Sequence, residues 1–177
     1  RELGVIQKLP RICVAQAQAA NPLYLAYKDG WDKFHAVTAK PTLASAIQIG
    51  NPVSVKKAMR TLQRFNGVVE QASEAELADA AARADRTGMF NCPHTGVALA
   101  ALRKLVTRKI IRPKERVVVI STAHGLKFAE QKAAYHQGQI EGVRSTHANR
   151  PQEVKGDLRA VTDAIKRYAE KIRLMGA

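Results

Sequence analysis

The sequence predicts an α/β fold in which a mostly parallel sheet is flanked by helices. Short apolar runs of strand length alternate with helical patterns of about 10 to 15 residues, which is the arrangement expected of βαβ units. Hydrophobic residues make up 46% of the 177 residues and charged residues 25%, as in packed globular proteins. This length suits one domain of ordinary size, or part of a larger one.

Apolar runs of four to six residues predict the strands. Three of them have the continuous apolar character of strands buried on both faces, and they cover residues 11–16, 67–72 and 116–120. The last run, with Val117 to Ile120 in succession, is the strongest strand signal in the chain. A further stretch of small and apolar residues, 44–49, is interpreted as the end of another strand because the turn Gly50-Asn51-Pro52 closes it.

Helices are predicted where apolar residues recur at helical spacing between capping and breaking signals. The predicted ranges are 23–29, 53–65, 74–86, 97–106 and a last amphipathic helix that begins at 158. Ser73 and Glu76 form a capping box before the third helix, and Asp157 is placed to cap the last one. Residues 128–157 have weak periodicity, so no element is predicted between Phe128 and Asp157.

The first candidate site follows the strongest strand, because ligands of open parallel sheets bind outside the carboxyl ends of the strands. There the chain reads Ser121-Thr122-Ala123-His124-Gly125. The two hydroxyl groups and the histidine can exchange hydrogen bonds with a ligand, and the glycine permits a close backbone approach. An ordinary turn, in which the hydroxyl groups satisfy local backbone groups, explains the same residues equally well.

Two weaker candidates lie elsewhere. The stretch that contains Ala46, Gly50 and Asn51 leaves room for a planar ligand and precedes a helix whose free N–H groups favour an anion, although plain turn chemistry is the favoured interpretation. Cys92 near His94 has the composition of a nucleophile with its base, but no third orienting group is evident, which favours a buried structural cysteine. Cys13 and Cys92 alone build neither a disulfide framework nor a zinc site, so no metal is expected.

The chain is strongly basic, with 29 Lys and Arg against 15 Asp and Glu, a formal charge of +14. Seven basic residues lie within 103–116, a density that suits binding to phosphate backbones. Two observations argue against nucleic-acid binding: only 5% of the residues are aromatic, and no nucleic-acid-binding motif is present. The cluster is interpreted as a solvated face at a helix C-terminus. No apolar stretch is long enough to predict a membrane span.

Three separate strings, residues 44–54, 87–98 and 117–128, resemble threonine synthases of the plant type. The resemblance implies a fold type II enzyme, similar to the tryptophan synthase β subunit, that depends on pyridoxal 5'-phosphate. It implies conversion of O-phospho-L-homoserine and water to L-threonine and phosphate. Residues 1–177 are then expected to be the C-terminal part of the catalytic domain. The Schiff-base lysine is expected upstream of Arg1, which would leave the isolated chain inactive.

By the same resemblance, Thr122 matches the hydroxyl residue that bonds the pyridine nitrogen of the cofactor, with Ser121 beside it. Ala46, Gly50 and Asn51 match a loop next to the cofactor and substrate. Lys127 lies outside the lysine motif of the family. The family further implies a homodimer without membrane association. Its location would be the chloroplast stroma in a plant, or the cytoplasm otherwise.

Two hypotheses compete with an enzyme fragment. The chain is also consistent with a truncated, non-catalytic paralog that acts as a binding or interaction module, because no lysine motif or glycine-rich phosphate loop is present in it. A basic nucleic-acid binder rests on the net charge alone and is the weakest of the three.

Overall fold

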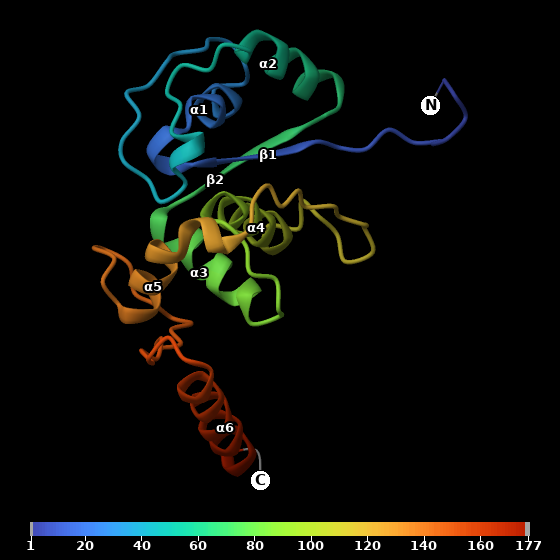
Figure 1. The fold of residues 1–177 in the computed structure, drawn as a ribbon. Helices are drawn as coiled ribbons and strands as arrows, with labels where there is room; N and C mark the ends of the chain where they lie inside the picture. Colours follow the sequence, from blue (N-terminus) through green and yellow to red (C-terminus); the bar gives the residue numbers. More distant parts are fainter. Residues whose placement is uncertain (1, 176–177) are drawn as a thin grey trace.

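The computed structural model describes residues 2–175, and its centre is a parallel pair of strands. Strand β1 (Cys13–Ala17) pairs with β2 (Val68–Ala72) in a register that places Cys13 opposite Val68 and Ala17 opposite Ala72. Helices α1 (Pro22–Lys28) and α2 (Val55–Arg64) lie between the two strands in sequence, so the segment is a βαβ unit (Figure 1). The predicted fold class, strands at 11–16 and 67–72 and both helices are confirmed.

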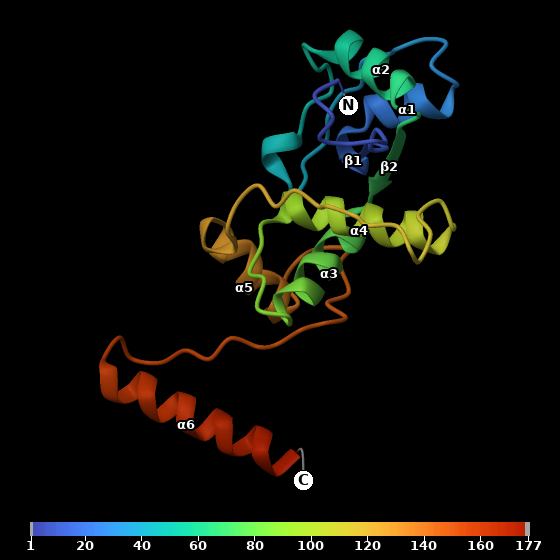
Figure 2. The same ribbon diagram turned by 90° about the vertical axis from the view of Figure 1, so that its right-hand side faces the viewer.

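The second half of the described chain is helical. Four helices follow β2: α3 (Glu74–Asp85), α4 (Pro93–Thr107), α5 (Ala129–Gln137) and α6 (Leu158–Met175). Short 3₁₀ turns cover Gln18–Ala20, Ser45–Ile47 and Gly125–Phe128. Figures 1 and 2 show α6 apart from the other elements in both views, at the end of an extended connection. Among residues 2–175, no helix combines the length and apolar character needed to cross a membrane.

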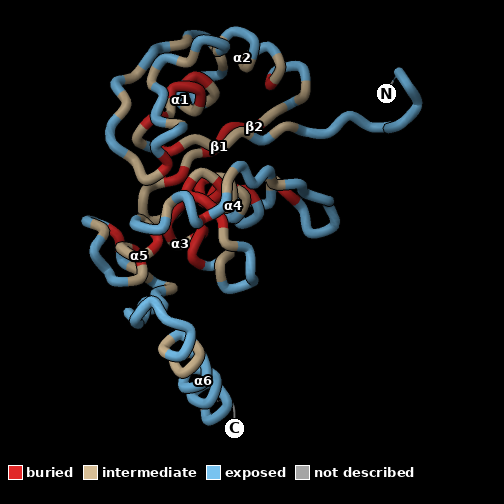
Figure 3. The backbone as a smooth tube through the Cα atoms, in the orientation of Figure 1, coloured by how far each residue is buried: buried red, intermediate tan, exposed pale blue. Residues whose placement is uncertain are grey.

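Alternation along β2 divides the core into two sides, because successive side chains of a strand point to opposite faces. Val69 packs with Leu23 of α1 and Leu62 of α2 on one face. Ala72 packs with residues of α3 and α4 on the other face, in the largest buried cluster. The buried residues in Figure 3 therefore concentrate around the strands and along α3 and α4, while the tube of α6 is exposed over most of its length.

The basic cluster at the end of α4 is partly built into this core. Glu70 is only 1% exposed on β2, and its carboxylate forms ion pairs with Lys104 and Arg108. Lys104 Nζ also donates to the backbone oxygen of Gln71 at 2.8 Å. The prediction of a solvated face for 103–116 is confirmed for its exposed basic residues, but Lys104 is half-buried, and together with Arg108 it neutralises a buried carboxylate. The sequence alone did not predict this contact, because helix α3 separates Glu70 from α4 along the chain.

The capping box predicted at the start of α3 is confirmed. Glu76 N–H donates to Ser73 Oγ at 3.3 Å, and Ser73 N–H donates to Glu76 Oε2 at 2.8 Å. Burial alone would raise the pKa of Glu76, but its bond from Ser73 and its contact with Lys104 outweigh burial and hold the pKa below its ordinary value.

Glu76→Gln is therefore expected to reduce the loss of stability in acid. Because the pKa is lower in the folded form, the stabilisation by Glu76 is complete above the ordinary carboxyl pKa and disappears as the pH falls through the lowered value. Urea unfolding at a series of acidic pH values measures this. The wild-type chain should lose stability more steeply than the variant, and equal slopes would contradict the role of Glu76.

Three predictions differ from the structure. Residues 116–120 do not form a strand: Val118 and Ile120 are 89% and 76% exposed, and no described strand pairs with them. A strand needs a partner to bond its backbone, so apolar composition alone does not produce one. The stretch 44–49 contains a 3₁₀ turn instead of a strand end. Helix α5 was missed because its apolar face is poorly defined, with Lys132 and Tyr135 as its buried residues.

Candidate functional site

The turn Ser121–Gly125 lies against the start of α4. Cys92 N–H donates to the backbone oxygen of Ala123 at 3.2 Å, and Gly125 N–H donates to that of Phe90 at 2.9 Å. Asn91 and His124 form an antiparallel bridge between these bonds. A Cβ on Gly125 would lie 2.8 Å from the Phe90 ring, so the glycine permits a close approach of the chain to itself. The third sequence candidate, around Cys92, therefore joins the first.

Four side chains meet at this junction. Cys92 Sγ lies 3.3 Å from Thr95 Oγ1 and 3.7 Å from Thr122 Oγ1. Thr95 Oγ1 lies 3.1 Å from Ser121 Oγ. Cys92 and Thr95 are at most 1% exposed, whereas Ser121 and Thr122 are exposed. A buried thiol and hydroxyl thus support two hydroxyl groups that can reach a ligand. We call Cys92, Thr95, Ser121 and Thr122 the hydroxyl–thiol cluster.

Cys92 caps α4, and its surroundings make it acidic. Its sulfur accepts a bond from the backbone N–H of Thr95 at 3.5 Å. Burial opposes ionisation of the thiol, but bonds from Thr95, His94 and Thr122 outweigh burial and lower its pKa to about 6. The sequence-based interpretation as a buried cysteine agrees with this placement. The sequence placed Thr95 and His94 close to Cys92 but did not show that their hydrogen bonds are directed at its sulfur.

The loop before Cys92 is held by a buried ion pair. Asp85 and Lys132 have side chains 11% and 10% exposed and lie 2.5 Å apart. Asp85 Oδ1 also accepts the backbone and side-chain N–H groups of Asn91 at 3.2 Å. Lys132 Nζ lies 5.1 Å from the centre of the Phe90 ring. These contacts connect the ends of α3 and α5 to the residues that pair with the turn 121–125.

The loop that contains Ala46 reaches the same helix end. Ala46 N–H donates to His94 Nε2 at 2.9 Å, so this N–H is occupied inside the chain. The carbonyl of Gly50 accepts Val37 N–H at 2.9 Å, and a Cβ at Gly50 would lie 1.8 Å from the Val37 oxygen. Asn51 is exposed. The structure thus brings Ala46 near the start of α4, while Gly50 packs against its own loop.

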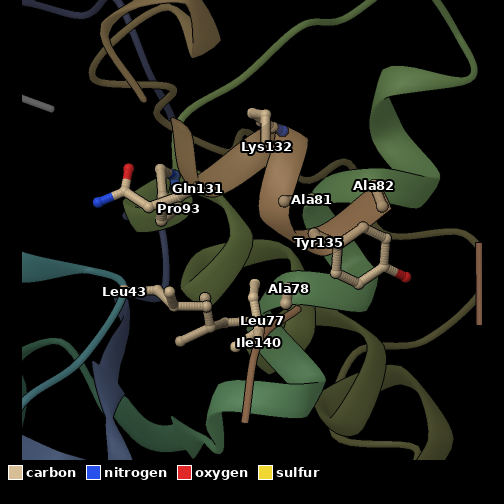
Figure 4. A pocket seen from close by; sticks show the side chains of 10 residues that line it. All are labelled: Leu43, Leu77, Ala78, Ala81, Ala82, Pro93, Gln131, Lys132, Tyr135 and Ile140. Atoms are coloured by element: carbon tan, nitrogen blue, oxygen red, sulfur yellow. The ribbon is translucent and has the colours of Figure 1, made fainter. Parts of the chain in front are cut away.

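A small, partly open pocket that includes Pro93 at the start of α4 is too small for a cofactor. It has a volume of about 30 Å³ and is lined by apolar side chains of α3 and by polar and aromatic side chains of α5, with Pro93 and Leu43 at its side (Figure 4). A wider groove of about 400 Å³ runs along α3 and α4 past Asp79, Arg103 and Thr107. Neither space contains Ser121 or Thr122, which lie on an open face. Within residues 2–175, no three His, Cys, Asp or Glu side chains gather as a metal site.

Comparison with known proteins assigns the chain to a class. Residues 2–123 match the family described as "Pyridoxal-phosphate dependent enzyme". That range covers well over half of the chain, so the chain belongs to the family of pyridoxal-phosphate-dependent enzymes. The family match includes Ser121 and Thr122 and ends one residue after them.

The relatives that the chain resembles in sequence include threonine synthases of a plant, an archaeon and a mycobacterium. The chain is 51% identical over 169 residues, 95% of its length, to Threonine synthase 2, chloroplastic, of Arabidopsis thaliana. It is 34% identical over 125 residues, 70% of its length, to the threonine synthase of Methanocaldococcus jannaschii, and 33% identical over 127 residues, 71% of its length, to that of Mycobacterium tuberculosis. The matches cover 33%, 31% and 33% of these relatives, so the chain spans about a third of their length.

The hydroxyl–thiol cluster fits one part of the family cofactor, its ring nitrogen. A hydroxyl group can donate to that nitrogen or accept from it when it is protonated, and Thr122 presents such a group on an exposed face. The cluster fits the cofactor phosphate less well, because the N–H groups of Thr95 and Gly96 at the start of α4 are bonded to Cys92. The donor set therefore suits the ring end of the cofactor better than its phosphate.

Proposed function

We propose that the chain is part of a threonine synthase, which converts O-phospho-L-homoserine and water to L-threonine and phosphate. The observation that carries the proposal is 51% identity over 169 residues to a relative with that name, an extent that covers the whole hydroxyl–thiol cluster. Threonine synthases of archaea and mycobacteria support it at lower identity.

In this proposal Thr122 bonds the ring nitrogen of pyridoxal phosphate, and Ser121 supports it from the adjacent position. Bound pyridoxal phosphate supplies an electron sink for the carbanion chemistry. A hydroxyl partner carries no charge, so it favours a protonated ring less than a carboxylate would. The loop with Ala46, Gly50 and Asn51 is proposed to lie beside the substrate, with Asn51 as an exposed side chain able to hydrogen-bond.

We propose further that residues 1–177 form the C-terminal part of the catalytic domain, with the Schiff-base lysine on another segment of the full protein. The exposed apolar residues Val118 and Ile120 support this arrangement, because such side chains are normally covered by a neighbouring strand or helix. Residues 116–120 would then complete a larger parallel sheet.

The experiment compares cofactor binding and turnover in the longest product of the reading frame that contains these residues. Pyridoxal phosphate should bind, with an absorbance band of its own, and the protein should release phosphate from O-phospho-L-homoserine. Thr122→Val should lower kcat by about tenfold or more, because one hydrogen bond to the ring is lost. Thr162→Val, on the distant helix α6, is the matched control and should retain activity.

The outcomes separate the candidates. Binding without turnover of O-phospho-L-homoserine would contradict threonine synthase but retain the cofactor. Failure to bind cofactor would favour the non-catalytic paralog.

The name of the Arabidopsis relative supports a chloroplast location if the source is a plant. A homodimer is proposed from the family resemblance, and sedimentation of the same product tests it.

A further inference from the structure

We propose that Cys92 and Thr95 are positioning residues that orient the hydroxyl groups of Thr122 and Ser121, and that Cys92 decides whether Thr122 gives or takes the proton shared with the cofactor ring. This inference rests on the proposed function, because it takes the role of Thr122 from it. The contact between Cys92 and Thr122 is a property of the chain itself and can be tested without the cofactor.

The need for positioning follows from the local structure. Ser121 and Thr122 are exposed and lie in a stretch without helix or strand, so no regular backbone ladder fixes them. The nearest backbone bonds to the α4 side are those of Ala123 and Gly125. Each hydroxyl instead meets one buried side chain: Thr122 meets Cys92, and Ser121 meets Thr95.

The supporting side chains are themselves well fixed. Cys92 and Thr95 are one helical turn apart at the start of α4, bonded to each other and at most 1% exposed. Helix α4 packs closely on α3, where a Cβ at Gly96 would lie 2.4 Å from the Leu77 oxygen. A rigid, buried pair holding two exposed groups is the arrangement that keeps a binding group in one geometry.

Proton counting gives the consequence for the ring. The hydroxyl of Thr122 has one proton to donate. If the sulfur of Cys92 is ionised, it accepts that proton's bond, and the Thr122 oxygen remains free to accept from a protonated ring nitrogen. If the thiol is protonated, it can donate to Thr122, whose own proton is then free for an unprotonated ring nitrogen.

Near neutral pH the ionised form of Cys92 is favoured. Burial opposes ionisation, but bonds from Thr95, His94 and Thr122 outweigh burial and lower the pKa of Cys92 to about 6. Two other titratable groups face this junction. His94 lies on α4 itself, and His124 lies on the turn segment that bridges to Asn91. Cys92 thereby favours a protonated ring without placing a carboxylate beside it.

The first test titrates the thiol in the 177-residue chain. Cys13→Ser removes the other cysteine, so the ultraviolet absorbance of the thiolate reports Cys92 alone. Thr122→Val should raise the midpoint by about one pH unit, because one bond to the charged sulfur is lost. Thr122→Ser should restore it, and Thr162→Val should leave it unchanged. An unchanged midpoint in Thr122→Val would overturn the contact.

The second test uses the cofactor-loaded product of the whole reading frame. Cys92→Ser keeps a small hydrogen-bonding group that does not ionise, and Thr95→Ser keeps the hydroxyl of its position. The absorbance of bound pyridoxal phosphate should change with pH around the Cys92 midpoint in wild type and Thr95→Ser, and this change should vanish in Cys92→Ser. Thermal melting followed by circular dichroism establishes that each variant is folded.

The two tests distinguish this inference from the proposed function. If bound cofactor in Cys92→Ser has the pH dependence of wild type, the positioning role is overturned while threonine synthase stands. If wild type binds no pyridoxal phosphate, the proposed function fails and the proton-directing role fails with it. The thiol titration still decides, in that case, whether Cys92 holds Thr122.

Discussion

Replacement of Lys132 by Met is expected to lower the free energy of unfolding by about 3 kcal/mol, the lower end of the range for breaking a buried ion pair. Both side chains of the pair with Asp85 are close to 10% exposed, so Met leaves a carboxylate charge with little access to water. The loss stays at the lower end because Asp85 keeps the two N–H bonds from Asn91. Urea unfolding of the chain measures it.

The double variant Asp85→Asn with Lys132→Met is the control. It removes the stranded charge while an amide oxygen can still accept from Asn91, so it should recover at least about half of the loss. A double variant as unstable as Lys132→Met alone would contradict the ion-pair explanation and assign the loss to packing against Phe90. Because Asn91 precedes Cys92, the single variant should also broaden the titration of the Cys92 thiol.

Elements with local signals were predicted well from the sequence. The capping box of Ser73 and Glu76 acts within one helical turn, so its effect can be read from neighbouring residues. The parallel pairing of the two strands was also predicted, because strands joined through helices pair in parallel. The N-cap role of Asp157, whose Oδ1 accepts from Ala160 N–H at 2.8 Å, is also confirmed.

Features that depend on distant partners were not predictable. Residues 116–120 have the composition of a strand, but a strand forms only beside another strand, and none of the described ones lies next to them. Glu70 is an acidic residue in an apolar run, and only the fold places Lys104 and Arg108 over it. Both partners of Glu70 lie more than 30 residues away in sequence.

The candidate site also has parts that the sequence predicted and parts that depend on distant contacts. The sequence singled out Ser121 and Thr122 on their own chemistry, and Cys92 as a separate, weaker candidate. The structure joins them through the bridge between Asn91 and His124. A signal was present, since Cys92 and Thr95 both lie at the start of an apolar helix and both carry groups able to hydrogen-bond. The sequence alone does not predict that the start of this helix lies against the turn 121–125.

Gly96→Val is expected to lower the free energy of unfolding by about 3 kcal/mol, the upper end of the usual cost of overpacking. A Cβ at Gly96 would lie 2.4 Å from the backbone oxygen of Leu77 and 3.1 Å from the Cβ of Ala81, so α3 and α4 would have to separate. That helix pair carries the largest buried cluster, and Cys92 and Thr95 lie on the same helix. Denaturation with urea, together with the melting temperature, measures the cost.

The smaller substitution Gly96→Ala tests the same contact, because the sign of its effect on the free energy of unfolding depends on that contact. In an open helix Gly→Ala stabilises by about 1 kcal/mol, because alanine is the better helix former. At Gly96 the same change should instead destabilise, since the first carbon added already meets the Leu77 oxygen. Gly156→Ala is the matched control, because no atom lies within 4 Å of its added Cβ, and it should change stability by less than about 0.5 kcal/mol. A stabilising Gly96→Ala would mean that the helices are not in close contact at this point, and the rigid support inferred for the hydroxyl–thiol cluster would lose its basis.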